Sequence, residues 1–295
     1  MVEYLSTLLS EEYVQYLDTW LNDWGFTVSL AVLAIEFIRQ MILRTLTWNV
    51  IGDAVTNYIT LAMFFGLNYL MIITFYVAGF YLVYEYFSVM HLPINGWTIL
   101  AAVVIADLIY YWEHRFMHRC GIGWATHTVH HSSPYFNISV AYRFGPLDGV
   151  MPFFFHIPIA MLGFNPIIIF FAEAFVQLYQ ALLHTEVVKK LPRPFEAIFN
   201  TPSHHRVHHG SNPEYIDKNY AGIFIVWDKM FGTFAEEKDK VIYGITTPLD
   251  SINPWTVFTH GLKKLAIQVW EANGFINKIN YIIKPPGWEP KEKVD

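Results

Sequence analysis

The sequence predicts an all-α integral membrane protein. Hydrophobic residues make up 54% of the 295 residues, aromatic residues 18% and charged residues 15%. Soluble domains carry roughly 25% charged residues, and a mean hydropathy of +0.30 over so long a chain indicates contact with lipid. Long apolar stretches separated by Pro and Gly account for this composition, and three clusters of histidines lie close to their ends.

The N-terminal residues 1–56 are expected to form an amphipathic or membrane-entry region. Within it, the stretch 26–42 is apolar but contains Glu36 and Arg39, so it is either a weak span or an interfacial helix. The acidic start of the chain is not typical of a cleavable signal peptide.

The strongest candidate span follows at residues 57–87, where the one acidic interruption, Glu85, lies near the end. Breakers in the segment 91–96 then predict a turn. A second apolar helix, 97–112, leads directly into the first histidine cluster. The region 150–183 is apolar but is interrupted by prolines and a glycine, so we expect two short helices that form a hairpin.

The distribution of Lys and Arg predicts the orientation in the membrane. The turn 88–96 contains neither residue type, whereas basic residues from Arg39 to Lys218 flank the other ends of the apolar stretches. This pattern places the histidine clusters on the cytoplasmic side. We therefore expect a membrane and histidine-cluster domain over residues 57–240 and a cytosolic C-terminal extension over residues 241–295.

Charge and cysteine content argue against two classes of function. The net charge of −6 gives no support for nucleic-acid binding. Cys120 is the single cysteine, which excludes an internal disulfide and a cysteine-based zinc site.

The histidines are concentrated in one part of the chain. Eleven of the thirteen lie between residues 114 and 209, and nine of these form three tight clusters. The clusters are His114 and His118; His127, His130 and His131; and His204, His205, His208 and His209. Spacings of three or four residues place imidazoles on one face of a helix. Neutral imidazole is the commonest metal ligand, and this number exceeds what one tetrahedral ion needs. The sequence therefore predicts a histidine-rich cap that holds two metal ions.

The type of metal chemistry follows from what the clusters lack. A zinc peptidase of the HExxH class needs Glu where this chain has Arg115. Soluble di-iron bundles use carboxylates that the clusters do not contain. What remains is a nearly all-nitrogen site for two redox-active ions, and iron is favoured. A membrane metal transporter or metal-binding protein is the alternative, although its ligands would be expected inside the membrane helices.

Three motifs resemble a known superfamily. The first runs over residues 110–118, the second over 127–133 with Asn137, Ser139 and Arg143 beyond it, and the third over 201–209 with the segments 217–220 and 227–233 after it. Over roughly residues 97–235 the chain is similar to the fatty acid hydroxylase and sterol desaturase superfamily, and within it to the alkylglycerol monooxygenase group. Arg119 stands where that group is expected to carry an acidic residue.

The resemblance implies a set of metal ligands by position. These are His114, His118, His127, His130, His131, His205, His208 and His209, with His184 as a further ligand from the end of the preceding helix. His204 lies four residues before His208 and is the alternative to His184.

The resemblance also implies an O2-dependent oxidoreductase with two iron ions. Such an enzyme hydroxylates or desaturates a C–H bond of a lipid, and ether-lipid cleavage is the activity of the alkylglycerol monooxygenase group. A sterol C-5 desaturase or C-4 methyl oxidase is the alternative. The chain contains no haem, Rossmann or ferredoxin motif. Electrons are therefore expected from an electron-transfer partner, either a redox protein or a reduced pterin.

One carboxylate is expected to support the histidines from behind. Metal-bound histidines usually donate their other ring nitrogen to a carboxylate or a carbonyl. Asp107 lies seven residues before His114, on nearly the same helical face, inside an apolar stretch. Glu173 and Glu186 are weaker candidates for this role, and Asp217 and Asp228 are expected to be loop or cap residues.

Overall fold

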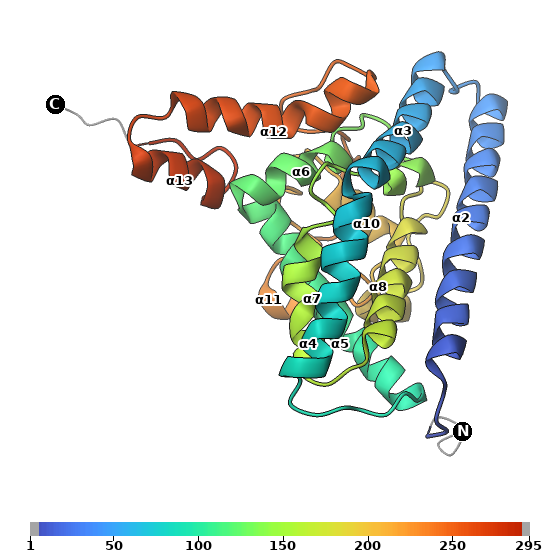
Figure 1. Ribbon diagram of the computed structural model, residues 1–295. Coiled ribbons are helices and arrows are strands. Elements are labelled where there is room, and N and C mark those ends of the chain that lie inside the picture. Colours follow the sequence, from blue (N-terminus) through green and yellow to red (C-terminus); the bar gives the residue numbers. More distant parts are fainter. Residues whose placement is uncertain (1–5, 291–295) are drawn as a thin grey trace.

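The computed structural model describes residues 6–290, apart from the side chains of residues 72 and 73. Among these residues there is no strand, and helices joined by loops form the whole architecture (Figure 1). The last five residues of the expected C-terminal extension, 291–295, lie outside the described part of the chain. The prediction of an all-α protein is confirmed.

Three helices are long and apolar enough to cross a membrane: α2 (Glu11–Ile42), α3 (Trp48–Met71) and α5 (Gly96–Arg119). Helix α2 begins well before the apolar stretch and continues unbroken through it. Its Glu36, which made this stretch doubtful as a span, is buried and accepts hydrogen bonds from the Ile138 backbone N–H (3.0 Å) and the Thr185 hydroxyl (2.5 Å). A paired carboxylate is compatible with a membrane span.

The predicted span 57–87 belongs to a longer helical run. Helix α3 already begins at Trp48, and it continues through a π-helical segment, η1 (Ile72–Val77), into α4 (Ala78–Phe87). A π-helical segment is a short, wider turn within a helix, so the helical run is not interrupted. The expected division at residue 57 falls inside α3, so residues 48–56 are part of this helix.

Helix α5 confirms the second predicted span and extends it to the first histidine cluster. Asn95 caps its start, since its Oδ1 accepts hydrogen bonds from the backbone N–H groups of Trp97 and Thr98 (3.0 Å each). The predicted hairpin is also present, as α7 (Met151–Met161) and α8 (Pro166–Ala181). Helix α8 packs against both α2 and α5, and a core of aliphatic and aromatic side chains fills the space between them.

Short helices and loops form the cap at one end of this bundle. They are α6 (Gly121–His131), the 3-10 helix η2 (Ile138–Tyr142), α9 (Arg193–Ile198), α10 (Pro202–His208) and α11 (Val226–Phe231). Two further helices, α12 (Pro254–Glu271) and α13 (Phe275–Ile283), extend sideways from that end, as the left of Figure 1 shows.

A buried polar network ties the cap to α3. The Arg143 guanidinium donates to Asp53 Oδ1 (2.9 Å) and to Asn57 Oδ1 (2.7 Å), which both lie on α3. It also donates to the Val129 carbonyl (2.9 Å) and to the Ser132 hydroxyl (2.9 Å) at the end of α6. Arg143 and Asp53 are each 1% exposed. This network therefore fixes the last turn of α6, which carries two clustered histidines, against a membrane helix.

Replacing Asp53 with Ala should destabilise the protein strongly, because it leaves the Arg143 charge buried without its partner. We expect a loss of about 3–5 kcal/mol in the free energy of unfolding, seen as a lower thermal unfolding midpoint in detergent. The matched control is Glu236→Gln, which removes the exposed partner of Lys190 and should leave the midpoint unchanged. Equal midpoints for the two variants would contradict a structural role for the buried pair.

Candidate metal centre

The structure gathers nine histidines into two adjacent groups. In each group, one possible ligand atom per residue lies within 4.8 Å of the others. The first group is His114, His118, His127, His131 and His208; the second is His130, His184, His205 and His209. These are the nine histidines that the sequence analysis names as ligands, and the structure brings all of them together.

Helical spacing explains how three short segments supply so many rings. On α6, His127 and His131 are one turn apart and belong to the first group, whereas His130 points to the second. Helix α10 divides its ligands in the same way, with His208 in the first group and His205 and the following His209 in the second. Because α6 and α10 contribute to both groups, the two groups lie side by side.

Backbone carbonyls fix the orientation of several rings. His114 Nδ1 lies 2.9 Å from the Tyr220 carbonyl oxygen and His208 Nδ1 lies 3.0 Å from that of Lys218. His184 Nδ1 lies 2.9 Å from the Gln180 carbonyl oxygen. A carbonyl only accepts, so each of these Nδ1 atoms carries the proton. The lone pair of each ring is consequently on Nε2, which faces the group.

Several buried Nε2 atoms make no hydrogen bond within the described part of the chain and could therefore bind a metal ion. Those of His118, His131, His208 and His209 are buried and have no hydrogen-bond partner among residues 6–290. Burying unpaired polar atoms is costly, so a set of them converging on one place fits a bound metal ion.

The spacing between nitrogens agrees with that interpretation. The Nε2 atoms of His114 and His127 are 3.0 Å apart, as are those of His184 and His205, and those of His184 and His130 are 3.3 Å apart. Two nitrogens bound about 2.1 Å from one ion lie about 3.0–3.4 Å apart at right or tetrahedral angles. The donor set and its geometry therefore fit two metal ions.

Burial keeps these rings neutral. It lowers the pKa of His184 to about 3 and that of His208 to about 4. The pKa values of His130, His205 and His209 are lowered well below 6.5, first by burial and then by repulsion from neighbouring imidazoles. Neutral rings at neutral pH have a free lone pair, which is the form that binds a metal.

His204 lies outside both groups. Its Nε2 is 3.0 Å from a carboxylate oxygen of Glu196, which also accepts hydrogen bonds from the hydroxyls of Thr201 and Ser203. Of the two alternatives in the sequence analysis, His184 is the one that the structure places in a group. Spacing along α10 could not exclude His204, because His204 lies four residues before His208, just over one helical turn away.

Asp107 has a different role from the one expected. It contacts none of the nine histidines in the described part of the chain. Instead, its carboxylate accepts hydrogen bonds from the backbone N–H groups of Ile223 (2.5 Å) and Phe224 (3.1 Å) and from the Trp227 indole (2.8 Å). Backbone N–H groups can satisfy the hydrogen-bonding capacity of a buried carboxylate as well as a histidine can.

Asp228 completes the support of the same segment. Its two carboxylate oxygens accept hydrogen bonds from the backbone N–H groups of Tyr220 and Ala221 (2.8 Å each). Together, Asp107 and Asp228 hold the segment 218–224, whose carbonyls orient two of the histidines. From the sequence, Asp228 is expected to be a loop or cap residue, because spacing rules do not identify its backbone partners.

The two weaker candidates make hydrogen bonds to residues other than the nine grouped histidines. Glu173 pairs with His156 Nδ1 (2.5 Å) and with the Tyr76 hydroxyl (2.5 Å), both in the helical bundle. Glu186 accepts a hydrogen bond from the Tyr243 hydroxyl (2.9 Å).

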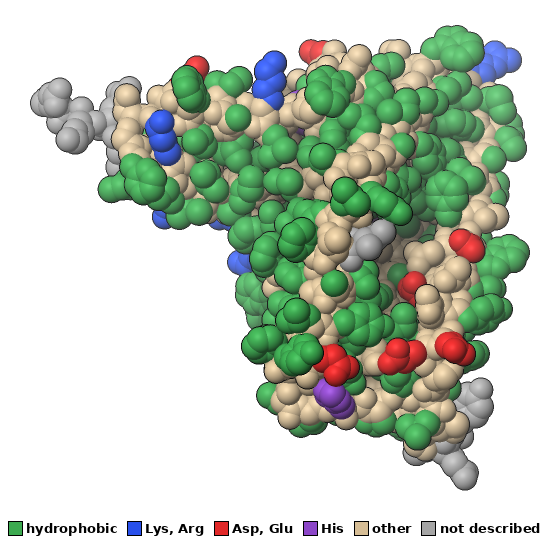
Figure 2. Space-filling model, in the orientation of Figure 1, with side chains coloured by type: hydrophobic (Ala, Val, Ile, Leu, Met, Phe, Trp, Pro, Cys, Tyr) green, Lys and Arg blue, Asp and Glu red, His purple; other side chains and the backbone are tan. Residues whose placement is uncertain are grey.

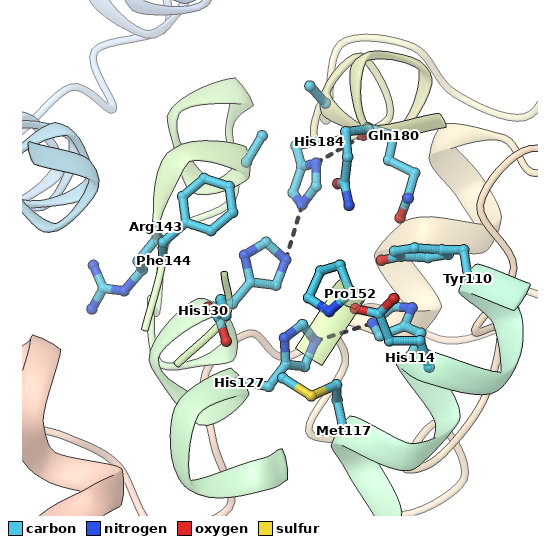
Figure 3. A pocket seen from close by; sticks show the side chains of 15 residues that line it. Tyr110, His114, Met117, His127, His130, Arg143, Phe144, Pro152, Gln180 and His184 are labelled. Atoms are coloured by element: carbon cyan, nitrogen blue, oxygen red, sulfur yellow. Dashed lines mark hydrogen bonds between the residues drawn. The ribbon is translucent and has the colours of Figure 1, made fainter. Parts of the chain in front are cut away.

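A cavity of about 90 Å³ lies against the histidines on the side of the bundle (Figure 3). Its walls include His114 and His127 from the first group and His130 and His184 from the second. Met117, Phe144 and Pro152 give it apolar surface. Two polar atoms in its lining residues, Glu113 Oε2 and Gln180 Nε2, are buried without a hydrogen-bond partner among residues 6–290. The cavity therefore places apolar walls and two polar groups beside the histidines.

Comparisons with known proteins support these features. Residues 99–233 match the sequence model of the fatty acid hydroxylase family. The chain is 44% identical to alkylglycerol monooxygenase of Danio rerio over 241 residues, which are 81% of this chain and 53% of that protein. It is 39% identical to the Homo sapiens alkylglycerol monooxygenase over 266 residues, 90% of this chain and 59% of that protein. It is also 26% identical to lathosterol oxidase of Mus musculus over 148 residues, 48% of this chain and 47% of that protein.

The chain thus spans little more than half the length of the first two relatives. No solved structure matches it. The matched region, residues 99–233, contains all nine grouped histidines. Over this region the chain is similar to the fatty acid hydroxylase family.

Proposed function

We propose that this chain is a membrane-bound di-iron oxygenase that uses O2 to oxidise a C–H bond of a lipid. The observation that carries the proposal is the convergence of nine imidazoles, in groups of five and four, beside a partly apolar cavity. The three candidate spans place this centre in a membrane protein. The similarity of residues 99–233 to the fatty acid hydroxylase family supports a lipid as substrate.

Iron is the metal that best suits this donor set. In the described part of the chain, neither group includes a cysteine or a carboxylate, so all donors are imidazole nitrogens. Imidazole suits iron as well as zinc, but four protein ligands would close a structural zinc site, and here nine are present for two ions. The chemistry that bound iron supplies is the reductive activation of O2.

The chain's own residues orient and isolate the reaction. The carbonyls of Lys218 and Tyr220 hold the protons of His208 and His114 on Nδ1, so their Nε2 lone pairs stay directed into the first group. The apolar walls of the cavity exclude water from the lipid carbon to be oxidised. Glu113 Oε2, which makes no hydrogen bond among residues 6–290 and lies 3.9 Å from His156 Nε2, could bond to a polar group of the substrate and so align that carbon.

The names of the relatives suggest substrates to test first. Two of the most similar relatives are alkylglycerol monooxygenases. More distant relatives are an ornithine lipid hydroxylase of Rhizobium tropici, 29% identical over 140 residues, and lathosterol oxidases. We propose an alkylglycerol-like lipid as substrate, with hydroxylation at the ether-linked carbon. The electron donor would be a reduced pterin or a redox protein, and the histidine groups would face the cytoplasm.

Detergent-purified protein loaded with iron should consume O2 only when lipid and reductant are both supplied. Alkylglycerol, ornithine lipid and sterol should be compared, each with a reduced pterin and with a redox protein as donor, and products identified by mass spectrometry. We expect alkylglycerol to give the highest turnover. Stoichiometric iron without turnover of any lipid would favour the metal-transporter or metal-binding alternative.

Loss of one ligand from either group should remove iron. We expect His118→Ala, in the first group, and His209→Ala, in the second, to lower the iron content from about two ions per chain and to abolish lipid oxidation. His204→Gln is the matched control, since His204 pairs with Glu196 outside both groups. Metal analysis by mass spectrometry measures the content. If His204→Gln lost as much iron as the other two variants, the assignment of ligands would be wrong.

Asp228→Ala should weaken metal binding without removing a ligand. The change releases the backbone of Tyr220 and Ala221, so the Tyr220 carbonyl no longer orients His114. We expect about 10–100-fold lower metal affinity, measured by competition with a chelator. The control is Glu186→Gln, which affects a carboxylate bonded to Tyr243 away from this segment. Unchanged affinity in Asp228→Ala would mean that the segment holds its shape without this carboxylate.

A further inference from the structure

Helix α13 presents an apolar face that the described part of the chain leaves uncovered. None of its residues is buried. Phe275, Ile276, Ile279 and Ile283 are 75%, 74%, 37% and 54% exposed. At these spacings the four side chains share one face of the helix, and polar Asn277 points away from it. An exposed apolar patch of this kind marks a surface that contacts another apolar phase.

The position of α13 indicates which phase that is. The Cys120 thiol donates a hydrogen bond to the Ile282 carbonyl (3.2 Å). At the neighbouring Gly121, a Cβ atom would lie 2.0 Å from the Tyr281 carbonyl oxygen, so the two backbones are in close contact. Cys120 and Gly121 directly follow Arg119, where the candidate span α5 ends. Helix α13 therefore lies beside the C-terminal end of a candidate membrane-spanning helix.

The arm formed by α12 and α13 also has the orientation expected of helices at a membrane surface. In Figure 1, both helices run across the direction of the long helices α2 and α5, and they project beyond the bundle. Figure 2 shows hydrophobic side chains over much of this arm, with Lys or Arg side chains at its upper and lower edges. A helix lying in the plane of a membrane surface has this direction relative to the spans.

Charge and tryptophan content of the arm fit a lipid surface. Between residues 254 and 290 the chain carries four lysines (263, 264, 278 and 284) and two glutamates (271 and 289), a net charge of +2, whereas the whole chain has −6. Trp270, at the end of α12, is 84% exposed. Lysine and tryptophan are enriched at the boundary between acyl chains and headgroups.

We propose that α13, with the end of α12, lies on the bilayer that holds the spans. Its Phe275–Ile283 face inserts at the boundary between headgroups and acyl chains, and the arm lysines face anionic headgroups. Helix α12 and the segment 285–287 after α13 also line a cavity of about 430 Å³ that reaches His118, His131 and His208. The contact with lipid thus keeps this second cavity at the membrane surface. The inference does not depend on the proposed oxidation chemistry.

Site-specific labelling of the full chain tests the contact. Because Cys120 is the single cysteine, a Cys120→Ser background permits one label at a time, at Ile276→Cys on the apolar face or at Asn277→Cys on the other side. Each protein is labelled with an environment-sensitive fluorophore and reconstituted in bilayers of phosphatidylcholine and phosphatidylglycerol, with and without bromine on the acyl chains. Phe275→Cys is a second probe of the apolar face, for the case that Ile276→Cys is not produced in folded form.

Bromine should quench the label at residue 276 at least about twofold more than the label at residue 277, because the apolar face lies within the acyl boundary. Replacing phosphatidylglycerol with phosphatidylcholine should reduce the difference. Equal quenching at both positions, or stronger quenching of the residue 276 label by aqueous iodide than by bromolipid, would overturn the proposal. A blue-shifted label at residue 276 that bromolipid does not quench would overturn it too, since the face would then be covered by protein.

Discussion

The candidate metal centre depends on hydrogen bonds made by the backbone segment 218–224. Two of its carbonyls accept the Nδ1–H groups of His208 and His114, so they determine which nitrogen of each ring faces the centre. The segment is itself held by the carboxylates of Asp107 and Asp228, which accept its N–H groups. Asn219, in this segment, has a positive φ of 56°. A backbone conformation that Asn tolerates better than most residues persists where surrounding bonds determine it.

Satisfying polar groups inside an apolar bundle is the second constraint. Buried Arg143 would be costly in a membrane protein without partners, but it is bonded to Asp53 and Asn57 and to the end of α6. Buried Glu36 similarly joins α2 to the loops at Ile138 and Thr185. These polar groups connect the spans to the segments that carry the histidines. The same bonds that make the groups tolerable in the bundle therefore position the centre.

Most of the elements, and the histidines that the structure gathers, were predictable from the sequence for identifiable reasons. Helical periodicity predicts that His127 and His131 share a face, and the breakers Gly163 and Pro166 predict the hairpin of α7 and α8. Both are local signals. The same rules did not distinguish His184 from His204. His204 pairs with Glu196 instead of joining a histidine group, and this pairing is recognised only in three dimensions.

Long-range contacts account for the remaining differences. Asp107 bonds to residues 223, 224 and 227, more than a hundred positions later in the chain, so no spacing rule could indicate them. The apolar stretch alone predicts a span from residue 57, whereas α3 begins at Trp48. The helix can include polar Asp53 and Asn57 because both are buried and bonded to Arg143. Tertiary partners changed the environment of these residues from exposed to buried.

Two cavities reach the histidine groups. The smaller cavity, among the apolar helices, touches two rings of each group, His114 and His127 together with His130 and His184. A molecule seated there would contact both groups at once. The larger cavity, between the cap and α12, reaches His118, His131, His208 and His209 and is bordered by Arg119 and Lys264. The first cavity therefore touches both groups, whereas the second touches mainly the first group and only His209 of the second.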